Sequence, residues 1–97
     1  MEKVEILAIC SHEGILQTII RLIKNNEQWN GTGAANVTDA VKLIDSGRFR
    51  LILLGSGISE ADEELLYSHS KTIPVIRHYG GGSGLLFGEI YEALQNK

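Results

Sequence analysis

The sequence has little of several features on which common protein functions depend. Its 97 residues include a single cysteine, Cys10, which excludes an intramolecular disulfide and a thiolate-rich metal site. No apolar stretch approaches the roughly 20 residues that a membrane-crossing helix needs, and the first residues lack the layout of a signal peptide. The net charge of −3 provides no basic field for a polyanion. We therefore expect a cytoplasmic protein with neither a membrane nor a nucleic acid as partner.

The remaining composition is that of an ordinary globular domain. Hydrophobic residues make up 43% of the chain and charged residues 22%, which is far from the composition of disordered segments. A chain of this length supports one hydrophobic core. We expect residues 1–97 to form a single domain.

The apolar pattern predicts four strands that alternate with four helices. Short apolar runs predict the strands, at 4–9, 29–35, 50–54 and 74–78. Between and after them, helical spacing of apolar residues predicts helices at 14–24, from the expected N-cap Thr38 to Gly47, after the expected N-cap Ser59, and after a turn at 80–84. We expect the third helix to turn Leu65, Leu66 and Tyr67 inward, and the last helix Leu85, Leu86, Phe87, Ile90, Tyr91 and Leu94.

This βαβαβαβα order predicts a three-layer α/β/α sandwich. Right-handed crossovers give a four-stranded parallel sheet with helices on both faces, and we predict the flavodoxin-like strand order 2-1-3-4. The topological switch point then lies between the first and third strands, where open sheets usually bind ligands. Two turns should meet there, Cys10-Ser11-His12 and Gly55-Ser56-Gly57, with Gly82-Ser83-Gly84 at the same edge of the sheet.

Several stretches of this pattern resemble response-regulator receiver domains. Ile6 to Leu16 resembles the opening strand, turn and first helix of that family, and Phe49 to Leu54 the strand that presents the phosphoacceptor. Residues 33–36, 40–44 and 73–76 extend the likeness, which covers about residues 3–79. The resemblance implies a bacterial two-component signalling domain that works by binding protein partners.

The residues at the family's reactive positions are different here. The metal-binding acidic pair falls on Cys10 and Ser11, the phosphoacceptor aspartate on Gly55, the switch hydroxyl on Tyr79, and the lysine near Ser83. A glycine supplies neither a nucleophile nor a metal ligand. We therefore predict a non-enzymatic pseudo-receiver, without metal or cofactor, that is not phosphorylated on aspartate. The chain also lacks one βα unit of the family near its C-terminus.

A second resemblance gives Cys10 a different role. The cytoplasmic B subunits of cellobiose-type sugar phosphotransferase systems carry a phosphorylated cysteine after their first strand, and Leu53-Leu54-Gly55 is also similar to that family. A thiolate at a helix N-terminus has a lowered pKa, which favours this chemistry. Glu13 would oppose a phosphate there. The other interpretation of Cys10 is a small buried hydrophobe.

Glycine-rich turns provide a third hypothesis, a small anion-binding sensor. Backbone amides of glycines can approach an anion closely. The candidate cleft comprises Ser11, His12, Gly55, Ser56, Gly57, Gly82, Ser83 and Gly84. The alternative, which we favour, is that the glycines only permit tight turns.

Partner binding is the general hypothesis that best suits a domain with a core but no catalytic set. We expect the contact surface at the fourth-strand edge and the last helix, and an exposed edge also allows a homodimer. The candidate contacts are Arg77, Tyr79, Phe87 and Tyr91. The alternative for Phe87 and Tyr91 is that they cover the core.

Overall fold

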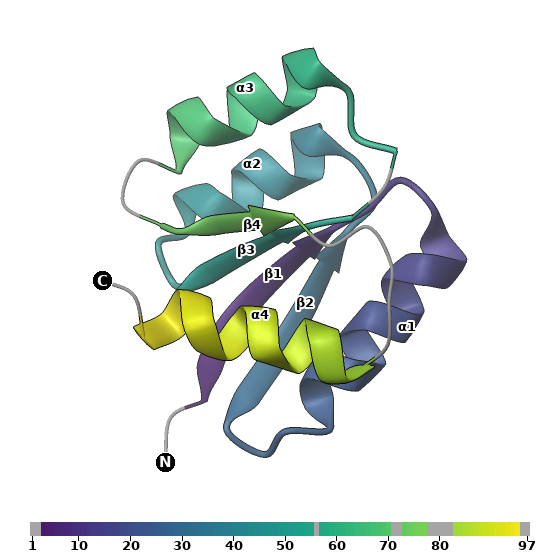
Figure 1. The fold of residues 1–97 in the computed structure, drawn as a ribbon. Helices are drawn as coiled ribbons and strands as arrows, with labels where there is room; N and C mark the ends of the chain where they lie inside the picture. The colour runs from purple at the N-terminus through teal and green to yellow at the C-terminus, as the bar shows by residue number, and fades with distance from the viewer. Residues whose placement is uncertain (1–2, 56, 71–72, 78–82, 96–97) are drawn as a thin grey trace.

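The chain folds into a parallel sheet with helices packed on both faces (Figure 1). The computed structural model describes residues 3–55, 57–70, 73–77 and 83–95. Within these ranges the strands are β1 (Val4–Ile9), β2 (Trp29–Ala34), β3 (Leu51–Leu54) and β4 (Val75–Arg77). The helices are α1 (Glu13–Lys24), α2 (Val37–Asp45), α3 (Glu60–His69) and α4 (Ser83–Gln95). The predicted βαβαβαβα order is confirmed.

The strand order is β2-β1-β3-β4 and every pairing is parallel, as predicted. Ile6 of β1 pairs with Gly31 of β2 on one side and with Leu51 of β3 on the other. The two central strands carry the apolar runs of the sequence because both of their faces are covered by helices. β2 and β4 lie at the edges, where we expected them.

Alternation along the strands divides the core between the two faces of the sheet. Ile6 and Ala8 of β1 belong to a cluster that includes apolar residues of α1 and α4, among them Leu86. Leu7 and Ile9 belong to a second cluster, which is formed with α2 and α3. Figure 1 shows the same division, with α1 and α4 on one side of the sheet and α2 and α3 on the other. Each face of the sheet therefore has its own hydrophobic layer.

The glycines of β2 lie directly beneath α1. A Cβ atom at Gly33 would be 2.4 Å from Cδ1 of Ile20 and 3.2 Å from the Leu16 side chain. At Gly31 it would be 3.2 Å from the Ile23 side chain. Glycine weakens a strand intrinsically, but here it allows a helix to approach the sheet closely. These residues therefore have a packing role.

The N-terminus of α2 differs from the prediction. Asn36, and not Thr38, is the N-cap, and its side-chain oxygen accepts a hydrogen bond from the Asp39 amide at 2.8 Å. Thr38 was the wrong choice because the helix already includes Val37. Gly47 follows the helix with a φ of 78°, a conformation that favours glycine. In α3 the predicted N-cap is confirmed, since Ser59 accepts from the Asp62 amide at 3.2 Å.

The buried side of α3 is narrower than predicted. Leu66 is fully buried, but Leu65 is 44% exposed and Tyr67 45% exposed, so their inward assignment was wrong. The side of the helix that faces the protein passes through Leu66 and Ser70, which is 5% exposed. Successive helical residues are about 100° apart, so both neighbours of Leu66 turn away from this side.

The last helix begins earlier than predicted. Ser83 and Gly84 belong to α4, and not to a turn that ends at 84. Leu86 and Ile90 are buried, but Leu85 is 57% exposed and was wrongly placed on the inward side. Tyr91, which was also predicted to turn inward, is 47% exposed. The spacing of four residues between Leu86 and Ile90 sets the face that packs on the sheet.

Candidate functional site

The carboxyl ends of β1 and β3 bring together part of the predicted site. Cys10 and Ser11 follow β1, and Gly55 follows β3. The Gly55 amide donates a hydrogen bond to the carbonyl oxygen of Ile9 at 2.7 Å, and the Cys10 amide donates to that of Ala34 at 3.1 Å. These bonds continue the sheet by one residue beyond the strands. Both turns are therefore held at the switch point by backbone pairing.

Cys10 and Gly55 are packed against each other. A Cβ atom at Gly55 would be 2.9 Å from Cβ of Cys10 and 3.1 Å from its Sγ. The Cys10 side chain is 0% exposed, and its Sγ lies 3.6 Å from the His12 carbonyl oxygen, to which it donates. The thiol is thus part of the core on the α1 and α4 face.

Ser11 and Gly57 form a second close contact between the two turns. Gly57 has a φ of 86°, and a Cβ atom there would be only 1.8 Å from Oγ of Ser11. A side chain at position 57 is excluded on both counts, because the backbone conformation favours glycine and the space is occupied. This contact supports the interpretation of the glycines as residues that permit tight turns.

Three other described residues of the predicted anion cleft are His12, Ser83 and Gly84. His12 is exposed at the N-cap of α1, makes no side-chain capping bond, and has its ring 3.6 Å from the position of a Cβ at Gly14. Ser83 and Gly84 are the first residues of α4, which packs on the same face of the sheet as α1 (Figure 1). Ser56, Tyr79 and Gly82 lie outside the described residues.

The described part of the chain contains no cluster of three or more histidine, cysteine, aspartate or glutamate side chains that could hold a metal ion. Among the described residues, Cys10, Ser11 and His12 contribute a buried thiol, a serine hydroxyl and an exposed imidazole at the switch point. None of them is a carboxylate. Among the described helices, none is both long and apolar enough to cross a membrane.

The described residues of the predicted interface lie on opposite faces of the sheet. Arg77 forms an ion pair with Glu63 of α3, on the side of the sheet that α2 and α3 cover. Phe87 and Tyr91 belong to α4, on the other side. The structure therefore does not bring Arg77 together with these aromatic residues.

Tyr91 and Phe87 pack against Trp29 at the start of β2. The ring centroids of Trp29 and Tyr91 are 4.9 Å apart with an interplanar angle of 56°, and those of Trp29 and Phe87 are 6.0 Å apart. The Asn26 side-chain amide donates to the Tyr91 hydroxyl at 2.8 Å. These contacts favour the alternative in which both aromatic residues cover the core.

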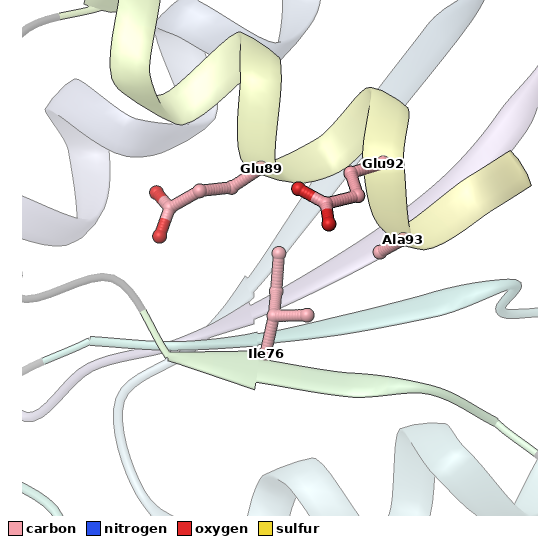
Figure 2. A pocket seen from close by; sticks show the side chains of 4 residues that line it. All are labelled: Ile76, Glu89, Glu92 and Ala93. Atoms are coloured by element: carbon pink, nitrogen blue, oxygen red, sulfur yellow. The ribbon is translucent and has the colours of Figure 1, made fainter. Parts of the chain in front are cut away.

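Sequence reasoning missed a groove between β4 and α4. It has a volume of about 210 Å³ and is lined by Ile76 from the strand and by Glu89, Glu92 and Ala93 from the helix. Figure 2 shows Ile76 directed toward the helix and both carboxylates beside the space between the two elements. The only sequence signal was the spacing of three residues between the two glutamates, which places them on one side of a helix.

Comparison with known proteins identifies the fold. No protein-family model matches the sequence, and no curated protein matches it. Among solved structures, a signal receiver domain from Vibrio parahaemolyticus is similar with a TM-score of 0.63 and 11% identity, over 96% of this chain and 91% of that one. A response-regulator receiver domain from Bermanella marisrubri gives 0.64 and 14%, over 96% and 99% of the two chains.

A third similar structure comes from Burkholderia pseudomallei and bears a name that relates it to pilus assembly. Its TM-score is 0.64 at 14% identity, over 94% of this chain and 73% of that chain. These identities are too low to carry an activity over from any of the three proteins. The chain has the fold of a response-regulator receiver domain, as its sequence pattern indicated.

Proposed function

We propose that this chain is a non-catalytic pseudo-receiver, a signalling domain that binds a protein partner and is not phosphorylated on aspartate. The fold supports a signalling role, because the similar structures include two receiver domains. One observation carries the rest of the proposal: the Cys10 side chain lies where a side chain at position 55 would project.

The chemistry of phosphoryl transfer explains why this contact matters. Transfer to an aspartate requires a carboxylate nucleophile and oxygen ligands for a divalent cation. Cys10, Ser11 and Gly55 provide no carboxylate, and the space between Cys10 and Gly55 is already filled. None of these three residues can therefore become an aspartyl phosphate. The end of β3 also has no room for a phosphorylated side chain.

Burial of Cys10 also weighs against the phosphocysteine carrier. A phosphoryl donor must reach the sulfur atom in line with its leaving group, but the Cys10 side chain is 0% exposed within an apolar cluster. Gly55 on one side and the His12 carbonyl on the other would have to move first. The close contact of Ser11 with Gly57 likewise leaves little room for the anion of the sensor hypothesis.

The net charge of the domain limits the kinds of partner that it can bind. With a net charge of −3, the domain is a poor binder of nucleic acid and of anionic lipid surfaces. We therefore infer a protein partner, met in the cytoplasm, where signalling domains of this fold act on other proteins.

Intact-protein mass spectrometry tests the proposal. The protein is incubated with acetyl phosphate and magnesium and, separately, with a phosphoenolpyruvate-driven phosphotransferase chain, beside an active receiver domain as positive control. We expect no phosphate adduct in either arm. An adduct from acetyl phosphate would refute the pseudo-receiver. An adduct from the phosphotransferase chain that the Cys10→Ala variant lacks would assign the protein to the sugar carriers.

A further inference from the structure

A pocket lies between the C-terminal end of α1 and the middle of α4, two helices that cover the same face of the sheet (Figure 1). It has a volume of about 220 Å³, and its described lining residues are Asn25, Asn26, Phe87 and Tyr91. Pockets that hold cofactors and drug-sized ligands usually measure about 300–1,000 Å³. The size of this pocket therefore suits a single ring or side chain of a larger ligand.

One wall of the pocket is aromatic. Phe87 and Tyr91 are four residues apart and therefore share one side of α4. Both rings pack on Trp29, which is 2% exposed and supports them from within the core. Phe87 is half-buried and Tyr91 is 47% exposed, so part of each ring surface remains open to the solvent. The wall therefore offers ring surface to a flat, apolar group.

Hydrogen bonds fix the polar groups beside this wall. The Asn26 Oδ1 accepts from the Gln28 amide at 2.8 Å, and its Nδ2 donates to the Tyr91 hydroxyl oxygen at 2.8 Å. Because that oxygen already accepts, the hydroxyl proton is left to donate, and no described residue accepts it. The exposed Asn25 side chain likewise makes no hydrogen bond to the described part of the chain.

The polar groups that remain for a ligand are mainly donors. They are the hydroxyl proton of Tyr91, the second hydrogen of the Asn26 Nδ2 and the amide of Asn25. None of the four described lining residues carries a charge. A complementary ligand is therefore neutral, presents a flat apolar ring and accepts hydrogen bonds. A proline residue meets all three conditions, because it has a ring and a carbonyl oxygen but no N–H group.

We propose that this pocket binds a proline-rich segment of a partner protein in the polyproline II conformation. A proline ring packs on Phe87 and Tyr91, while carbonyl oxygens of the segment accept from the Tyr91 hydroxyl and from the asparagine amides. The inference rests on the proposed function, since it names the chemistry of the partner of a domain that acts by binding protein.

The 97 residues cannot supply this segment themselves. Their one proline is Pro74, which directly precedes β4, and its carbonyl oxygen accepts from the Ile52 amide at 3.0 Å. A second copy of these residues therefore offers no proline-rich stretch to the pocket. The segment has to come from another sequence, as a partner protein would provide it.

An NMR titration of the isotope-labelled protein tests the proposal. The probe is an end-blocked peptide of repeated serine-proline-proline units, and the side-chain amide signals of Asn25 and Asn26 are followed. The control peptide has the same length and replaces each proline by glycine, which keeps the carbonyl groups and removes the rings. We expect saturable shifts with the proline peptide and none with the glycine peptide.

Protein variants locate the site. Tyr91→Phe keeps the ring and removes the hydroxyl donor, and Asn25→Ala removes an exposed amide that makes no bond to the described part of the chain. Each should weaken binding by about two- to tenfold, as expected for the loss of one hydrogen bond. Tyr67→Phe removes a hydroxyl from a tyrosine of α3 that is 45% exposed, on the other face of the sheet, and should leave binding unaltered. Circular dichroism melts establish that each variant is folded.

Three results would overturn the inference. They are the absence of saturable shifts with the proline peptide, equal binding of the glycine peptide, and binding that neither Tyr91→Phe nor Asn25→Ala weakens. All three leave the phosphorylation test untouched. Conversely, a phosphate adduct would refute the pseudo-receiver without affecting the peptide titration, so the two proposals fail separately.

Discussion

The side chain of Cys10 occupies the space into which a side chain at position 55 would project. The two residues end neighbouring central strands, and a Cβ at Gly55 would lie 2.9 Å from Cβ of Cys10. Contacts this short between carbon atoms do not occur without movement of one partner. The packing around the end of β3 therefore leaves no room for an aspartate side chain at position 55.

The first prediction concerns this pair of residues. Gly55→Ala should reduce the free energy of unfolding by about 1–3 kcal/mol, as expected for overpacking of a filled core. In a Cys10→Gly background the added methyl group has room, so the same change should cost less, with a coupling energy of about 0.5–3 kcal/mol. Urea denaturation of the four proteins measures the coupling. Additive effects would show that the two positions do not compete for space.

A second prediction contrasts two glycines. Gly33→Val should destabilise the protein by about 1–3 kcal/mol, because its side chain would enter the space held by Ile20 and Leu16. Gly88 lies in α4, and apart from its chain neighbours and the backbone of its own helix no described atom lies within 4 Å of the position of a Cβ. Gly88→Ala should therefore stabilise the protein by about 0.5–1 kcal/mol through helix propensity. Thermal and urea melts measure both, and equal effects at the two positions would contradict the packing described for β2.

A third prediction uses Trp29, the only tryptophan of the chain, as a fluorescent reporter. Tyr91→Ala removes a ring that packs on Trp29 and should lower stability by about 0.5–1.5 kcal/mol beyond the loss of buried area. It should also shift the tryptophan emission to longer wavelength, since Trp29 is now 2% exposed. Tyr91→Phe keeps the ring and loses only the bond from Asn26, so it should leave the emission unchanged. An unshifted emission in Tyr91→Ala would show that the Tyr91 ring does not shield Trp29 from water.

The fourth prediction distinguishes the two candidate N-caps of α2. Asn36→Ala should lower stability by about 1 kcal/mol because the Asp39 amide loses its acceptor. Thr38→Ala, at an exposed position within the helix, should change it very little. Urea denaturation compares the stabilities of the two variants. A larger loss of stability in Thr38→Ala would show that Thr38 is the N-cap of α2.

The fold could be predicted because its strongest signals are local. The run Leu51–Leu54 is buried at every residue, and such a run between two amphipathic segments specifies a central parallel strand. The alternation of strands and helices then restricts the strand order, since crossovers are right-handed and short. The expected meeting of the turns after β1 and β3 followed from that topology alone.

The surfaces could not be predicted in the same way because they depend on tertiary placement. β4 has only three residues, so its sequence did not reveal that Arg77 faces α3 while Ile76 faces α4. Tyr91 of the last helix was expected to share a contact surface with the β4 edge, but it packs on Trp29 instead. The space between Cys10 and Gly55 is likewise a property of two strands that are distant in sequence, and a glycine alone does not disclose it.

The most direct test of the central claim is an amide chemical-shift titration of the isotope-labelled protein. Acetyl phosphate with magnesium and, separately, inorganic phosphate are added while the amide signals of Ser11, Gly55 and Gly57 are followed. A switch point that is packed shut predicts no saturable shift of these signals in either titration. Saturable shifts at all three residues would show that the site takes up a phosphate or a phosphoryl group, and would contradict the account given for Cys10 and Gly55.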